Sequence, residues 1–142
     1  MATAPTPESA LEVGTVVAER VVHLTRESLV RYAGASGDFN PIHYRDDVAE
    51  RVGLPGVLAH GMLTMGLAVE TVIDWLGDSG RILEYGVRFT RPVVVDAEDG
   101  AELRVVAKVG AVDDVAVRID LTVSHGDTVV LGKAQVRVRP NA

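Results

Sequence analysis

The segment GDFNPIHYRDD, residues 37 to 47, places an acid and an imidazole five positions apart, in Asp38 and His43. Pro41 lies between them and disfavours a helical backbone at Asn40, so the segment is predicted to be a bent loop. A bend there lets both side chains point at one spot, where a carboxylate and an imidazole can activate a water and deliver a proton. The alternative, favoured by the loose spacing alone, is an Asx turn in which Asp38 caps the backbone.

A second segment, LAHGMLTMG at residues 58 to 66, could supply an amide that binds an oxyanion. Gly61 opens a long apolar run that is predicted to be a helix. Its N–H therefore has no partner within the helix and lies at the positive end of the helix dipole. Such an amide can hold the oxygen of a thioester enolate. Gly61 can equally serve close packing at the helix entry, and His60 is more simply a structural histidine bonded to backbone than a substrate neighbour.

Other side chains of the predicted helix are weaker candidates. Glu70 is a charge on an apolar helix and is either a catalytic carboxylate or, with Asp74 one turn later, part of a polar stripe. Such a stripe would face solvent or a partner subunit. Met62 and Met65 belong either to the core or to the wall of an apolar substrate tunnel, and the sequence does not separate these.

Two arginines of the segment VRFTRPV, Arg88 and Arg91, could contact a phosphate of a phosphopantetheine group or carrier protein. For either arginine taken singly, a solvated strand face is the commoner environment. His23 and His125 fall in a predicted strand and a predicted turn, and neither is assigned a chemical role.

Composition indicates the kind of protein in which this chemistry would occur. The chain has 142 residues, no cysteine and a formal net charge of −6. These values fit one globular domain and exclude disulfides, thiolate catalysis and cysteine-ligated zinc. The positive residues are dispersed, so nucleic acid is not an expected partner. Residues 1–10 are predicted to be a flexible tail without a signal peptide, no segment is predicted to span a membrane, and the chain is predicted to be cytosolic.

The elements that would position the candidate residues follow from residue types and turn signals. A strand is predicted at 15–24, followed by a helix that Thr25 caps and that Gly34 and Gly37 end. A short helix follows the loop, and residues 61–76 form one long helix that is apolar almost all round. Turn signals divide the rest of the chain into four β runs: 82–95, 101–112, 115–125 and 128–139.

A central apolar helix combined with antiparallel strands predicts a single α+β domain over residues 11–142. The strands can cover one central helix only by curling around it. This is the hot-dog architecture, a curved antiparallel sheet wrapped around a long helix. Because such a sheet ends in an edge strand and leaves part of the helix open, dimerisation is expected.

Taken together, the motifs resemble a known family. The stretch YAGASGDFNPIHYRDDVAERVGLPGVLAHGMLTMG resembles, nearly position for position, the hydratase segment of the MaoC-like (R)-specific enoyl hydratases and dehydratases. The stretch EYGVRFTRPVVV is similar to the R-F-x-x-P-V strand of that family, so the resemblance covers most of residues 11–139. Within the family, SGDFNPIH, GLPGVLAHGMLTMG and WLGDSG are most similar to the catalytic subunit of the mycobacterial dehydratases that act on (3R)-hydroxyacyl-ACP.

The resemblance implies a reaction and a set of roles. Asp38 and His43 would be the catalytic pair that holds one water, and the Gly61 N–H would bind the oxyanion. Three positions would support the loop: Asn40, Pro41 and His60. The implied reaction is the reversible hydration of trans-2-enoyl thioesters of CoA or acyl carrier protein (ACP) to (3R)-3-hydroxyacyl thioesters. It needs no metal and no redox cofactor.

One departure from the family concerns a serine that several of its hydratases carry further along the central helix. The stretch here is GLAVET, so only Thr71 could supply a hydroxyl in that region. Two other functions stay open: a hot-dog thioesterase that uses Glu70, and an acyl-binding or structural subunit of a heterodimer. A non-catalytic subunit would be expected to lack the Asp/His pair, which this chain keeps. The expected partner is therefore an identical or related hot-dog subunit.

Overall fold

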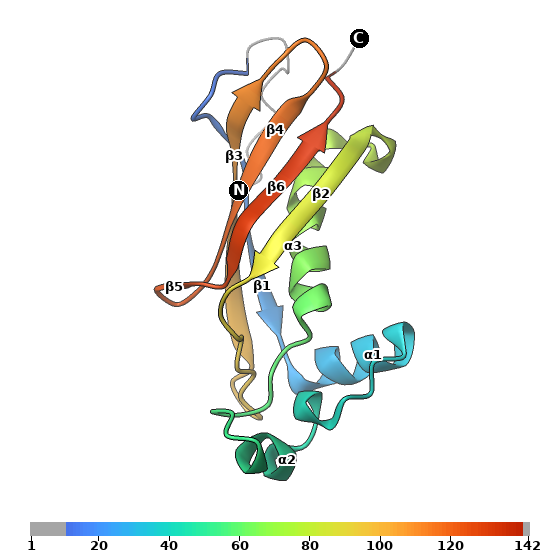
Figure 1. Cartoon of the computed structure of the whole chain (residues 1–142), viewed down its shortest axis with the longest axis vertical. Helices are drawn as coiled ribbons and strands as arrows, with labels where there is room; N and C mark the ends of the chain where they lie inside the picture. Colours follow the sequence, from blue (N-terminus) through green and yellow to red (C-terminus); the bar gives the residue numbers. More distant parts are fainter. Residues whose placement is uncertain (1–10, 141–142) are drawn as a thin grey trace.

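The computed structural model describes residues 11–140, so the tail predicted over residues 1–10 lies outside the described residues. One antiparallel sheet, a long helix against it and a cluster of short helices at one end make up the described chain (Figure 1). The strands are β1 (Val16–Leu24), β2 (Ile82–Phe89), β3 (Ala101–Val112), β4 (Val117–His125), β5 (Thr128–Val129) and β6 (Leu131–Val138). The helices are α1 (Arg26–Ser36), η2 (Pro41–His43), α2 (Asp46–Arg51), α3 (Gly61–Leu76) and η3 (Ser79–Arg81). None of the helices in this range combines the length and the apolar composition that a bilayer crossing requires.

The sheet has the strand order β1-β3-β4-β6-β2, with β5 paired to β4. Within β3 and β4, alternate side chains are buried, and Val105 lies opposite Val123 in the register that joins the two strands. Because successive side chains of a strand point to opposite faces, this register gives the sheet one apolar face and one polar face. The predicted alternation is confirmed, and so is the α+β class.

Three predicted strand runs have wrong boundaries. The run at 82–95 stops at Phe89, because the chain turns there and Pro92 has no N–H with which to continue a ladder. The run at 115–125 begins at Val117, because the Asp113 side chain accepts two backbone N–H groups and closes a turn before it. The run at 128–139 divides at Val130 into β5 and β6.

Helix α3 spans Gly61 to Leu76 as predicted and packs along the apolar face of the sheet (Figure 1). Its buried side chains are Thr64, Ala68, Thr71 and Val72. The Tyr85 hydroxyl donates to the Met65 carbonyl at 2.7 Å, and burial raises the pKa of Tyr85 to about 12. The opposite side of the helix is uncovered, and Met62 is 58% exposed. A single chain therefore encloses only part of the helix.

Three of the short helices, α1, η2 and α2, lie at the end of the molecule where α3 begins, whereas η3 follows the other end of α3 (Figure 1). Helix α1 starts in a capping box between Thr25 and Ser28, as the predicted cap requires, and ends at Gly37, whose φ of 76° is left-handed. Gly34, the other predicted stop, lies inside the helix. Arg26 links α1 to two other segments. Its guanidinium donates to the Val95 carbonyl at 2.6 Å and pairs with Asp46 of α2 at 2.8 Å. The loop between α1 and α2 is thereby held over the start of α3.

Candidate active site

The loop that follows α1 contains both features weighed above, an Asx turn and a carboxylate oxygen outside that turn. Asp38 Oδ1 accepts from the Asn40 N–H at 3.1 Å, and Asn40 Oδ1 accepts from the Ile42 N–H at 3.2 Å. Pro41 occupies the first position of η2 and fixes the bend. Asp38 therefore caps the backbone, as the alternative interpretation held, but does so with only one of its two oxygens.

The second oxygen of Asp38 faces His43. Asp38 Oδ2 lies 3.9 Å from His43 Nε2, which is too long for a direct hydrogen bond. A water oxygen placed about 2.8 Å from both atoms would form an Oδ2–water–Nε2 angle of about 90°, within the range that a water's hydrogen bonds tolerate. The spacing thus accommodates one water bound by both groups.

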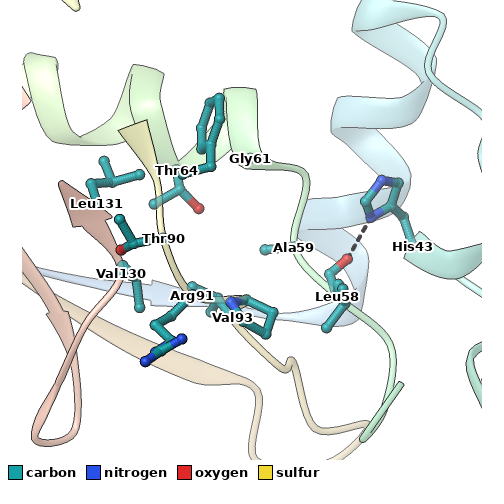
Figure 2. Close-up of a pocket in the computed structure, with 12 residues that line it drawn as sticks. His43, Leu58, Ala59, Gly61, Thr64, Thr90, Arg91, Val93, Val130 and Leu131 are labelled. Atoms are coloured by element: carbon teal, nitrogen blue, oxygen red, sulfur yellow. Dashed lines mark hydrogen bonds between the residues drawn. The ribbon is translucent and has the colours of Figure 1, made fainter. Parts of the chain in front are cut away.

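The surroundings of His43 decide which of its nitrogens can take up a proton. Nδ1 lies 2.7 Å from the Leu58 carbonyl oxygen (Figure 2). A carbonyl only accepts, so Nδ1 carries the hydrogen of the neutral ring. Nε2 then presents its lone pair on the side where Asp38 Oδ2 lies. The His43 side chain is about 10% exposed and that of Asp38 about 49%, so water reaches the pair from the Asp38 side.

His60 packs directly against His43. The two ring centroids are 3.8 Å apart with planes inclined by 22°, and Tyr32 of α1 meets His60 edge-on at 4.7 Å. His60 Nε2 lies 3.2 Å from the Asp38 carbonyl oxygen, so His60 is bonded to backbone as predicted. Burial lowers the pKa of His60 below its ordinary value of 6.5, and the hydrogen bond to Asp38 offsets only part of that shift. The His60 ring is neutral at pH 7.

A cavity of about 350 Å³ opens between the start of α3 and the end of β2 (Figure 2). Gly61 and Thr64 line it from the helix, and His43 lines it from the loop. The other lining residues are Leu58, Ala59, Phe89, Thr90, Arg91, Pro92, Val93, Val130 and Leu131. No side chain caps α3, and within residues 11–140 the Gly61 N–H has no acceptor. An unpaired amide at the positive end of the helix therefore borders the same cavity as His43.

Gly61 also permits a close approach, which was the alternative explanation for a glycine at this position. A Cβ atom there would lie 3.0 Å from ring atoms of Phe89. Phe89 ends β2, lines the cavity and is 55% exposed, so its ring has room to move. The lack of a side chain at Gly61 lets Phe89 close over the helix start.

The four residues suggested to bind substrate occupy different places. Arg91 lines the cavity, whereas Arg88 is exposed on β2 and does not. Met62 lies on the uncovered side of α3, and Met65 is half-buried with its carbonyl bonded to a tyrosine. Neither methionine lines the cavity of a single chain. Their role in binding an acyl chain stays a prediction.

Two residues further along α3 are remote from the cavity. Glu70 lies about 14 Å along the helix from Gly61 and shares Arg20 with Asp74, at 3.4 and 3.2 Å, which confirms the polar stripe. Thr71 is buried, and its hydroxyl has no partner among residues 11–140. It does not line the cavity of a single chain, so the suggestion that Thr71 supplies a hydroxyl at this site stays a prediction.

Sequence reasoning missed Thr64 and most of the opposite cavity wall. Thr64 lies three positions after Gly61, a spacing that places both on one helix face, and that signal could have identified it. The opposite wall joins segments that become neighbours only on folding. Thr90 and Val130 illustrate this, because the Thr90 N–H donates to the Val130 carbonyl at 3.2 Å. Nothing local in the sequence links those two positions.

Asp38, His43 and His60 can each offer one metal-ligand atom within 4.8 Å of the others. Two features oppose a shared ion. The stacked rings keep their lone pairs in two nearly parallel planes, and His60 Nε2 already donates to the Asp38 carbonyl. The arrangement suits a bound water better than a metal ion.

The amino-acid sequence is similar to a known protein family. Residues 9–131 match the family described as MaoC like domain. The chain is 38% identical over 80 residues to the 3-hydroxyacyl-thioester dehydratase X of Mycobacterium tuberculosis. The matched stretch covers 56% of this chain and 28% of dehydratase X. It is 29% identical over 116 residues to the (R)-specific enoyl-CoA hydratase of Rhodospirillum rubrum, covering 81% of this chain and 80% of the hydratase.

A solved structure described as a MaoC-like dehydratase has the same fold. It superposes with a TM-score of 0.91 at 34% identity and covers 99% of this chain and 43% of the dehydratase. The likeness confirms the predicted hot-dog fold. The chain spans less than a third of the length of dehydratase X and less than half of that solved chain.

Proposed function

The chain belongs to the MaoC-like domain family, and we propose that it interconverts trans-2-enoyl and (3R)-3-hydroxyacyl thioesters by adding or removing one water. One arrangement carries the proposal. Asp38 Oδ2 and His43 Nε2 are 3.9 Å apart, and His43 and the unpaired Gly61 N–H border one cavity. The names of the two sequence relatives, a 3-hydroxyacyl-thioester dehydratase and an enoyl-CoA hydratase, support the same reaction class.

In the hydration direction, C3 of the enoyl thioester is electrophilic because negative charge can flow to the carbonyl oxygen. A water held between Asp38 and His43 bonds to C3 through its oxygen while His43 Nε2 takes one of its protons and Asp38 accepts a hydrogen bond from the other. The Gly61 N–H stabilises the enolate oxygen that forms. The proton on His43 then passes to C2, the thioester re-forms and His43 returns to its neutral state. Hydroxyl and proton thus add to the same face.

Dehydration is the same sequence reversed. His43 Nε2 removes a proton from C2 of the 3-hydroxyacyl thioester, and the enolate oxygen is again held at Gly61. His43 then returns that proton to the departing hydroxyl, which leaves as water beside Asp38. The bond between His43 Nδ1 and Leu58 keeps the ring oriented through both directions.

The carrier of the acyl group is proposed to be CoA or ACP, because both present the thioester on a phosphopantetheine arm. Arg91 lines the cavity, and Arg88 lies on the exposed face of the neighbouring strand. A guanidinium is well suited to a phosphate, so either arginine can pair with the phosphate of the arm. The catalytic pair itself is expected to act equally on both carriers.

The working form is proposed to contain a second hot-dog chain, identical or related. Strand β2 is at an edge of the sheet and exposes Leu83 and Phe89, and the uncovered side of α3 exposes Met62. A partner over this region would bury the apolar side chains and bring Met62 and Met65 into the wall of a substrate tunnel. The mass of the purified protein in solution tests the pairing, and a strictly monomeric active enzyme would rule it out.

The reaction is tested by following the loss of enoyl-thioester absorbance when the purified full chain is given trans-2-enoyl-CoA substrates of several lengths and then the corresponding acyl-ACPs. We expect His43→Ala to lower kcat by at least about 100-fold, because it removes the group that transfers the proton. His125→Ala, which removes an imidazole at the end of β4 outside the cavity, serves as the matched control and should stay within about twofold of the wild type. Full activity of His43→Ala would refute the assignment.

A further inference from the structure

We infer that His60 is a neutral positioning residue that holds Asp38, His43 and the Gly61 amide in one fixed arrangement. The inference deepens the proposed function and rests on it for its kinetic readout. Its structural basis is independent, because it follows from three contacts of the buried His60 ring and from the bonds that the His60 main-chain carbonyl accepts. Those contacts reach α1, the catalytic loop, η2 and the start of α3.

The His60 ring is held on both sides. His43 stacks on one side at a centroid distance of 3.8 Å, and Tyr32 of α1 meets the ring edge-on at 4.7 Å with planes inclined by 65°. Only 1% of His60 is exposed. Because His43 is stacked against a ring that is enclosed on both sides, the plane of the His43 ring is fixed, and the bond from Nδ1 to Leu58 then points Nε2 toward Asp38.

Hydrogen bonding assigns one tautomer to His60. Nε2 lies 3.2 Å from the Asp38 carbonyl oxygen, which only accepts, so Nε2 carries the hydrogen. Nδ1 is buried and has no partner among residues 11–140. Protonating Nδ1 would create a buried donor without an acceptor, next to His43, which must itself carry a proton during the reaction. The environment therefore favours the neutral Nε2–H form.

The same residue also anchors the oxyanion side of the site. The His60 carbonyl accepts from the N–H groups of Leu63 and Thr64 at 3.1 and 3.2 Å, so it forms the first bonds of α3. Gly61 follows it directly in the chain. The side chain of His60 thus fixes the Asp38 backbone and the His43 ring, while its main chain fixes the amide opposite them.

Two substitutions separate the contributions of the ring and of its N–H. His60→Phe keeps an aromatic ring between Tyr32 and His43 but loses the donor to Asp38, whereas His60→Gln keeps a donor but loses the stacking. We expect each to lower kcat by about tenfold and His60→Ala by about 100-fold, with KM within about threefold of the wild type, because a small misplacement of reacting groups costs rate more than binding.

The matched control is His125→Phe. His125 also bonds a backbone carbonyl through its ring, from Nδ1 to Glu102 at 2.9 Å, but it lies at the end of β4, outside the cavity. This variant should keep kcat within about twofold of the wild type. Circular dichroism and thermal melting of every variant establish that it is folded before its kinetics are compared.

A second readout does not depend on activity. Nitrogen-15 NMR of the histidine rings should show the neutral His60 ring as the Nε2–H tautomer and the neutral His43 ring as the Nδ1–H tautomer. In His60→Phe the His43 signals should keep that pattern, whereas in His60→Gln they should move toward a mixture of tautomers because the stacking is lost. A wild type without thioester activity would refute the proposed function, while these spectra would still decide the placement of the rings.

The inference is overturned by any of three results. The first is a His60 ring that carries its hydrogen on Nδ1 or titrates like a free histidine. The second is a His43 tautomer that is unchanged in His60→Gln. The third is full kcat in both His60→Phe and His60→Gln in an enzyme whose wild type is active.

Discussion

The C-terminal end of α3 is capped, whereas its N-terminal end is not. At the C-terminal end, Gly77 adopts a φ of 70° and its N–H donates to the Ile73 carbonyl at 2.8 Å, which closes the last turn. At the N-terminal end no side chain caps the helix, and the Gly61 N–H has no acceptor within residues 11–140. The end with the unpaired amide is the end that borders the cavity.

The two ends of α3 also differ in whether their ionisable groups are exposed or buried. Near the C-terminal end, Glu70 and Asp74 share Arg20 on an exposed surface. Near the N-terminal end, His60 is buried and its pKa is lowered by that burial. Exposed ion pairs contribute little to stability, whereas burial makes the protonation state of a group part of the structure. The candidate site thus lies where polar groups are buried and not where charges are most numerous.

The sharpest test of this difference substitutes one acid near each end. Asp38→Asn keeps the shape of the side chain but removes the charge that holds the water against His43, so we expect kcat to fall by about 10² to 10⁴-fold. Asp74→Asn, the matched change near the C-terminal end, should leave kcat within about twofold. Steady-state kinetics on one enoyl-CoA substrate measure both variants. Equal losses in the two would remove the distinction between the ends.

The sequence predicted those elements whose signals lie within the element itself and failed where contacts with distant residues decide the structure. The apolar run at 61–76 and the alternation at 101–112 predicted α3 and β3 correctly, because each pattern has the period and length of one element. The end of β2 was predicted wrongly, because the run of β-branched residues continues to Val95, whereas the chain turns after Phe89 and the Thr90 N–H bonds to the Val130 carbonyl. Period alone carries no information about such a contact.

The same contrast holds for the residues of the candidate site. Asp38, His43 and Gly61 stand in short patterns that nominate them by type and spacing. Thr71 was nominated because hydratases of the family carry a serine in that region of the helix, but in a single chain Thr64 lines the cavity and Thr71 does not. The stacking of His43 on His60 joins two segments that only the folded chain brings together, so no spacing rule could have revealed it.

A second test exchanges the glycine at each end for alanine. In Gly61→Ala the new Cβ would meet the Phe89 ring at 3.0 Å, so Phe89 must shift at the cavity, and we expect kcat/KM to fall by about tenfold. Its unfolding free energy should change by less than about 1 kcal/mol, because a helical alanine is unstrained. Gly77→Ala places a side chain at a φ of 70° and should cost about 1 kcal/mol of stability without altering kcat.

Kinetics and urea unfolding of both variants provide the measurements. The double variant Gly61→Ala with Phe89→Ala tests the physical cause, because removing the ring should restore part of the lost kcat/KM if crowding is responsible. A stability loss at Gly61 together with an activity loss at Gly77 would reverse the comparison between the two ends.

The smallest expected effect is a pH dependence of stability that originates at the N-terminal end. The pKa of His60 in the folded chain is below 6.5, so well above pH 6.5 the ring is neutral in both the folded and the unfolded states. As pH falls through 6.5, the unfolded state binds a proton that the folded state does not, so the unfolding free energy decreases until pH falls below the folded pKa. We expect a decrease of less than about 1.4 kcal/mol per pH unit, the limit for one proton.

Urea unfolding at several pH values between 5.5 and 7.5 measures this component as the difference in slope between the wild type and His60→Phe. Asp46 and Asp96 also have lowered pKa values, through a hydrogen bond from Arg26 and from backbone N–H groups respectively, but their unfolded pKa values near 3.8 put their effect below this window. Glu70→Gln, at the exposed end, should keep the wild-type slope. If His60→Phe kept it as well, the buried imidazole would not be the group that loses its proton on folding, and the two ends of the helix would respond to pH alike.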